Sequence, residues 1–87
     1  MVNNRPYGQF SPTGVQLRAA RAGLGLSVQA LARESGLGVN TLRRAEDQPG
    51  AVTMTAVNLQ RLADVLAAHG VTFVEANEDG PGVRFKV

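Results

Sequence analysis

Three side chains with strong hydrogen-bonding chemistry lie close together in the segment GLGVNTLRRAED, residues 36–47. Arg43 and Arg44 follow Asn40 by three and four positions, so all three share one face if this segment is a helix. An arginine can donate two parallel hydrogen bonds to O6 and N7 of guanine, and an asparagine can form a similar pair with adenine. A neighbouring valine can pack on the methyl group of thymine. The spacing therefore predicts a base-reading surface for double-stranded DNA, composed of Val39, Asn40, Arg43 and Arg44.

Each of these residues also has an ordinary structural interpretation. The two arginines could form a solvated helix face, since charged side chains are mostly exposed in any protein. Asn40 could do no more than hydrogen-bond to the backbone near the start of the helix. Val39 could pack against the protein instead of reaching a base. The turn that precedes these residues favours the DNA-binding interpretation of the arginines.

The surrounding pattern is that of two short helices joined by a tight turn. Ser27 is a candidate N-cap for a helix over residues 28–35, and the glycine that follows stands where helices commonly end in a left-handed residue. The second helix begins after Gly38. With Gly38 as its cap, Leu37 and Leu42 take the two positions of a hydrophobic staple. Two short helices with this connection are typical of the unit that enters the DNA major groove.

Longer amphipathic helices are predicted on either side of this unit. The first covers residues 12–22, with Ser11 as its cap and a proline in its first turn. The last covers residues 55–68 and is closed by His69 and Gly70. The apolar residues that we expect to face the core are Val15, Leu17, Ala20, Leu24, Leu31, Ala32, Leu42, Ala45, Ala56, Leu59, Leu62, Ala63, Leu66 and Ala67.

The C-terminal part changes to the alternating pattern of strands. The segments VTFVE (71–75) and VRFKV (83–87) are separated by a turn sequence, which predicts an antiparallel hairpin. Two strands alone are barely stable in water, so the hairpin must lie on the helices or pair with another hairpin. Its apolar residues, which are candidates for a dimer interface, are Val71, Phe73, Val83, Phe85 and Val87.

The charge distribution agrees with a polyanionic partner for the first half of the chain. Residues 1–44 hold six arginines and one acidic residue, whereas residues 45–87 hold three basic and six acidic residues. The chain has no cysteine and one histidine, His69, so no thiolate metal site or catalytic group can be assembled. No apolar run approaches the roughly 20 residues that cross a bilayer. We expect no enzyme activity, no cofactor, no metal and no membrane partner.

The helices and the turn together resemble the Cro/C1-type (XRE) helix-turn-helix family of phage and bacterial repressors. The resemblance covers about residues 15–66 and is carried by LRAARAGLGLSVQALARESGLGVNTLRRAE, residues 17–46. In that family an arginine late in the first helix and a glutamate ending the recognition helix form a buried ion pair. The resemblance places this pair at Arg21 and Glu46, for which unrelated surface charges are the alternative. It places the base-reading positions at Val39, Asn40 and Arg44, with Arg43 on the flank.

The resemblance also implies contacts with the DNA backbone, because free amides at a helix N-terminus can hold a phosphate. Two positions depart from the family pattern. Val28 stands where a DNA-bonding glutamine usually opens the second helix, and Gly38 stands where a serine or threonine usually caps the third. We expect the residues near the DNA backbone to be Ser27, Val28, Gln29, Gly38 and Thr41.

These observations predict a mainly α fold, namely a four- to five-helix, repressor-like helix-turn-helix domain with a C-terminal β-hairpin. The DNA-binding domain would cover residues 11–70, after a flexible arm over residues 1–10 and before the hairpin over residues 71–87. Arg5 and Tyr7 of the arm could reach DNA, although a disordered tail is the simpler interpretation.

The expected function is that of a bacterial regulator of transcription, a repressor or autoregulator from a prophage or mobile element. It would bind an inverted repeat as a homodimer and reside in the cytoplasm, associated with the nucleoid. The apolar face of the hairpin, or the unpaired edge of its last strand, is the candidate dimer surface. Two alternatives stay open: an antitoxin that binds DNA and neutralises a toxin, and a protein-interaction antiactivator that keeps the fold without binding DNA. Val28 and Gly38 favour the second.

Overall fold

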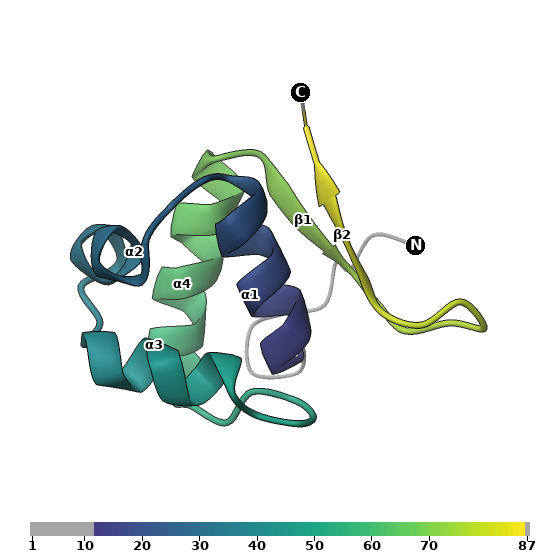
Figure 1. Cartoon of the computed structure of the whole chain (residues 1–87), viewed down its shortest axis with the longest axis horizontal. Helices are drawn as coiled ribbons and strands as arrows, with labels where there is room; N and C mark the ends of the chain where they lie inside the picture. Colours follow the sequence, from purple (N-terminus) through teal and green to yellow (C-terminus); the bar gives the residue numbers. More distant parts are fainter. Residues whose placement is uncertain (1–11, 87) are drawn as a thin grey trace.

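The computed structural model of the chain describes residues 12–86, which form a mainly helical body and one β-hairpin (Figure 1). The helices begin and end close to where the sequence pattern predicts them. The shift is largest for the first helix, which starts two residues later than expected. The described elements are α1 (Gly14–Gly23), α2 (Val28–Ser35), α3 (Val39–Glu46), α4 (Ala56–Ala68), β1 (Val71–Val74) and β2 (Gly82–Phe85).

The start of α1 differs from the prediction because a different residue caps it. Thr13 has extended backbone angles, and its side chain accepts a hydrogen bond from the Gln16 amide at 3.0 Å. The Gln16 side chain accepts one from the Thr13 amide at 2.8 Å, which completes a capping box. The expected cap, Ser11, lies outside the described residues, as do the arm over residues 1–10 and Val87.

The core lies between the four helices and is dominated by leucine. The largest fully buried side chains are Leu17, Leu31, Leu42, Leu62 and Leu66. The prediction for Val15 is wrong, because its side chain is 70% exposed. The face that α1 buries contains Gly14, Leu17 and Ala20, and Val15 points away from it. Two alanines of α4 that were expected inside, Ala56 and Ala67, are exposed as well.

Gly14 fixes which face of α1 turns inward. A Cβ atom added there would lie 2.6 Å, 2.7 Å and 2.8 Å from the carbonyl oxygens of Gln48, Glu46 and Ala45. The first turn of α1 therefore packs directly against the C-terminal end of α3, at a distance that only a glycine permits.

The hairpin lies on the helices, as the sequence analysis expected for one of its two possible supports. Packing against α1 and α4 stabilises the two strands. The strands pair in an antiparallel register that joins Val71 to Phe85 and Phe73 to Val83. Strand β1 packs on α4 and β2 on α1, and Figure 1 shows the connecting loop extending away from the helices. Val71 is buried, and Phe73 and Val83 pack against the core.

Two contacts from α1 hold the hairpin in place. The Gln16 side chain amide donates hydrogen bonds of 2.9 Å to the carbonyl oxygens of both Val74 and Gly82. At the other end of α1, the ring of Phe85 occupies the space beside Gly23, where an added Cβ would lie 2.3 Å from the ring. The helices thus cover part of the apolar face of the hairpin: Val71 is buried, Phe73 and Val83 are half-buried, and Phe85 keeps 37% exposure. Because Val71 is buried in the chain's own core, it is not accessible to a second copy, whereas the dimer interface itself stays a prediction.

Candidate nucleic-acid interface

The turn between α2 and α3 is built as the sequence predicts. The Ser27 side chain accepts a hydrogen bond from the Ala30 amide at 3.0 Å, and Gly36 ends α2 in the left-handed conformation with φ 74°. Leu37 and Leu42 are both buried on either side of Gly38, as a hydrophobic staple requires. These contacts fix the direction in which α3 leaves the turn.

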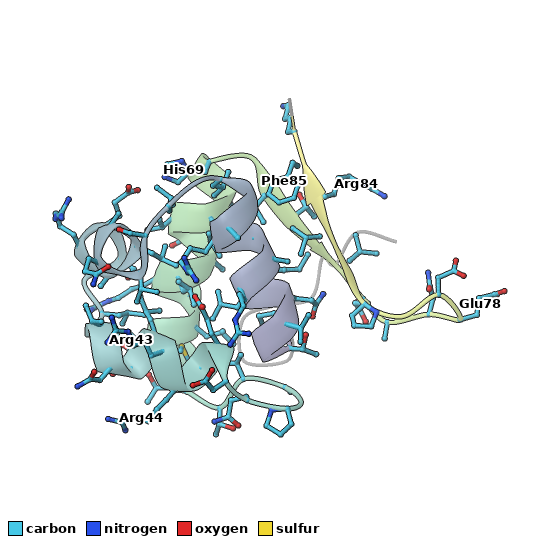
Figure 2. The ribbon with its side chains drawn as sticks, viewed as in Figure 1. Arg43, Arg44, His69, Glu78, Arg84 and Phe85 are labelled. Carbon is cyan, nitrogen blue, oxygen red and sulfur yellow. The ribbon has the colours of Figure 1, made fainter. Side chains whose placement is uncertain are left out.

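Three polar residues of α3 project from one exposed face. Asn40, Arg43 and Arg44 are exposed, whereas Leu42 and Ala45 on the opposite face are buried. Figure 2 shows Arg44 on the side of α3 that faces away from the other helices. Within residues 12–86, none of the three polar side chains makes a hydrogen bond or an ion pair, so their donors remain available to a ligand.

Val39 does not belong fully to this exposed face. Its side chain is half-buried and packs against the core cluster. Of the two interpretations left open from the sequence, packing against the protein is therefore the one that the structure supports.

The residues expected near the DNA backbone fall into two groups. Gln29 and Thr41 are exposed, so their side chains are accessible. Val28 is half-buried against the core, and Gly38 caps α3 without any side-chain hydrogen bond. Ser27 is exposed, but its hydroxyl already accepts the Ala30 amide.

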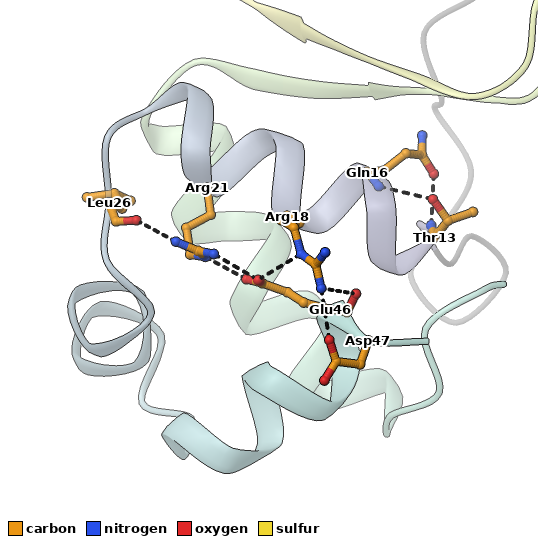
Figure 3. A network of polar contacts seen from close by, with 7 residues as sticks. All are labelled: Thr13, Gln16, Arg18, Arg21, Leu26, Glu46 and Asp47. Atoms are coloured by element: carbon orange, nitrogen blue, oxygen red, sulfur yellow. Dashed lines mark hydrogen bonds and ion pairs between the residues drawn. The ribbon is translucent and has the colours of Figure 1, made fainter. Parts of the chain in front are cut away.

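Behind α3, Arg21 and Glu46 form the ion pair that the resemblance implied. Arg21 Nε lies 2.6 Å from Glu46 Oε2, and Nη2 donates to Oε1 at 2.9 Å (Figure 3). The third nitrogen, Nη1, donates to the carbonyl oxygen of Leu26 at 2.9 Å. Glu46 retains only 5% exposure of its side chain. The hydrogen bonds to Glu46 raise the pKa of Arg21 above its ordinary value, although burial opposes them and the charge of Glu46 assists them.

A second arginine of α1 contacts the same end of α3, and the sequence analysis missed it. Arg18 Nη2 donates to Asp47 Oδ1 at 2.8 Å and to the carbonyl oxygen of Glu46 at 3.3 Å. Arg18 Nε also lies 3.8 Å from Glu46 Oε1. The signal was present in the sequence, since two arginines of α1 are spaced to share a face and two adjacent acids follow α3.

His69 makes a contact between two helices. It caps the C-terminal end of α4, as expected, and its Nε2 lies 2.7 Å from Glu34 Oε1 of α2. In the described part of the chain no group of three or more histidine, cysteine or acidic residues is placed to hold a metal ion.

None of the helices in residues 12–86 has both the length and the apolar character that crossing a bilayer requires. Compared with models of known protein families and with curated proteins, the sequence matches none of them.

Proposed function

We propose that the chain is a sequence-specific DNA-binding regulator of transcription that acts as a homodimer. In this proposal α2 and α3 are a helix-turn-helix unit of the Cro/C1-type (XRE) kind within a repressor-like domain, and α3 is the recognition helix. Two recognition helices about 34 Å apart would enter successive major grooves on one side of the duplex and read an inverted repeat. Occupancy of the site would then regulate the adjacent promoter.

One observation carries this proposal. Asn40, Arg43 and Arg44 project from a single face of α3 with no partner inside the described chain, on a helix whose other side is anchored by Glu46. Unpaired arginines usually stay in water at little cost, so exposure alone decides nothing. Here the helix is short, its direction is set by a tight turn, and its end is held by two arginines of α1. Such preorganisation suits side chains that must meet base edges with correct geometry.

The outer edge of β2 is the surface that we propose for the dimer. The Lys86 amide donates to the carbonyl oxygen of Gly70, so alternation along the ladder turns the backbone groups of Val83 and Phe85 away from β1. Within the described residues β2 has β1 as its one strand neighbour. An exposed edge of this kind can pair with the same edge of a second copy. We prefer this edge to the apolar face, because the helices already cover part of that face.

The test is selection of bound sequences from random duplex DNA at about 0.15 M salt, because non-specific binding is weak at that ionic strength. The oligomeric state is measured in parallel by light scattering. We expect an enriched inverted repeat and a dimer. A chain that enriches no sequence would contradict DNA reading.

A protein-interaction module without DNA binding is the second candidate. It is favoured by the half-buried Val28 and by Gly38, which leave two expected backbone-contact positions without a side-chain donor. The same selection separates the two candidates, since only a DNA reader enriches a motif.

A further inference from the structure

Arg18 and Asp47 form an exposed ion pair at the C-terminal end of the proposed recognition helix. Their atoms Nη2 and Oδ1 lie 2.8 Å apart, and the two side chains are 55% and 73% exposed. An isolated pair this exposed contributes little to stability, because water and salt screen it. Its position on α3 suggests a role in ligand binding.

Asp47 follows Arg43 by four positions and Arg44 by three, so its carboxylate stands on the same helix face as both arginines. Oppositely charged side chains at these spacings attract each other. In this structure the Asp47 carboxylate bonds instead to Arg18 of α1, while Arg43 and Arg44 have no partner in residues 12–86. Arg18 is thus the cation that pairs with the carboxylate on the same helix face as the proposed base-reading arginines.

We propose that Arg18 is a positioning residue that captures Asp47 and so keeps Arg43 unpaired and available to nucleic acid. The proposal rests on the DNA-binding function proposed above. Without Arg18, the Asp47 carboxylate pairs with Arg43 along the helix, and DNA must break that pair before it can bind. A free carboxylate beside the interface also repels phosphate.

The first experiment measures DNA affinity at low salt for Arg18→Gln, Asp47→Asn and the double variant. Arg61→Gln on α4 and Glu78→Gln on the hairpin loop (Figure 2) are matched controls, because they change the same charges at exposed positions outside α3 and outside β2. We expect Arg18→Gln to bind about two- to fivefold more weakly than Arg61→Gln, which is the range that exposed ion pairs produce. We expect the double variant to bind as well as Asp47→Asn.

Restored affinity in the double variant distinguishes a positioning role of Arg18 from a purely stabilising role. If Arg18 acted only by holding the fold together, removing the Asp47 carboxylate would not restore affinity. An Arg18→Gln variant that binds like Arg61→Gln, or a double variant as weak as Arg18→Gln, overturns the proposal. Should Arg18→Gln not fold, Arg18→Met provides the same comparison, since it also removes the cation but keeps the apolar stem of the side chain.

The second experiment needs no DNA. NMR relaxation of the Nε–H group of Arg43 is compared between the wild-type chain, Arg18→Gln and the double variant. We expect the group to be mobile in the wild type, restrained in Arg18→Gln, and mobile again in the double variant. Unchanged mobility in Arg18→Gln overturns the proposal. A chain that binds no DNA but shows this pattern would contradict the proposed function and leave the role of Arg18 intact.

Discussion

Arg21 and Glu46 form a two-bond ion pair, 2.6 Å and 2.9 Å, between the last turn of α1 and the last residue of α3. The same guanidinium donates to the carbonyl oxygen of Leu26, so it also fixes the segment between α1 and α2. The Arg21 side chain thereby connects α1, α3 and the segment that leads into α2. The direction of α3 depends on this contact from one end and on the turn at Gly36 from the other.

Replacing Arg21 with alanine should destabilise the protein strongly. The Glu46 carboxylate would remain buried with only Arg18 nearby, and breaking a buried pair in this way costs about 3–5 kcal/mol of unfolding free energy. Thermal and denaturant unfolding followed by circular dichroism measure the effect. Arg33→Ala, an exposed change on α2, is the control and should unfold like the wild type. An Arg21→Ala variant that melts with the wild type would remove the claim that this pair positions α3.

Gly14→Ala should also destabilise the fold, because the added methyl group would meet the three carbonyl oxygens at the end of α3 and force α1 and α3 apart. Overpacking of this kind costs about 1–3 kcal/mol. Gly50→Ala is a matched control, since an added Cβ there meets no atom within 4 Å. Equal unfolding midpoints for the two variants would show that the first turn of α1 does not rest on α3 as described.

Gln16→Ala should loosen the hairpin. The change removes the donor to the Val74 and Gly82 carbonyl oxygens and the acceptor of the capping box, and such losses cost about 1–3 kcal/mol when the groups are buried. Hydrogen exchange should speed up in β1 and β2 more than in α2 and α3. The exposed Gln29→Ala is the comparison. Uniform exchange across the chain would argue against a specific tie between α1 and the hairpin.

Val83→Pro tests the proposed dimer edge. The Val83 amide faces away from β1, so a proline there removes an edge donor while the hairpin's own ladder remains. We expect a monomer by sedimentation, with Val83→Ala still a dimer. Deleting residues 71–87 is not a clean alternative, because Val71 is part of the core. A dimer that survives the proline change would exclude the β2 edge.

The sequence was sufficient where a local rule decides the structure. The cap at Ser27, the left-handed Gly36 and the Leu37–Leu42 staple are all set within a few residues, and α2 has the predicted bounds. Periodicity failed for Val15, since the inward face of α1 is decided by how closely Gly14 approaches α3.

Contacts between segments that are far apart in the sequence could not be predicted either, because they depend on how the elements pack. The partners of Gln16 are 58 and 66 positions away, and no spacing rule connects them. Gly23 ends α1 and also makes room for the Phe85 ring, which lies 62 positions further along the chain. The candidate site was more accessible to prediction, because Asn40, Arg43 and Arg44 lie within two turns of one helix.

Selection from random duplex DNA, carried out in parallel with the wild-type chain and Arg44→Ala, tests the central claim most directly. If the exposed face of α3 reads bases, the variant should lose preference at one base pair in each half-site, a loss of about 1–3 kcal/mol, and keep the others. Identical preferences with a uniformly lower affinity would place Arg44 on phosphate, and no enriched sequence for the wild type would contradict the account.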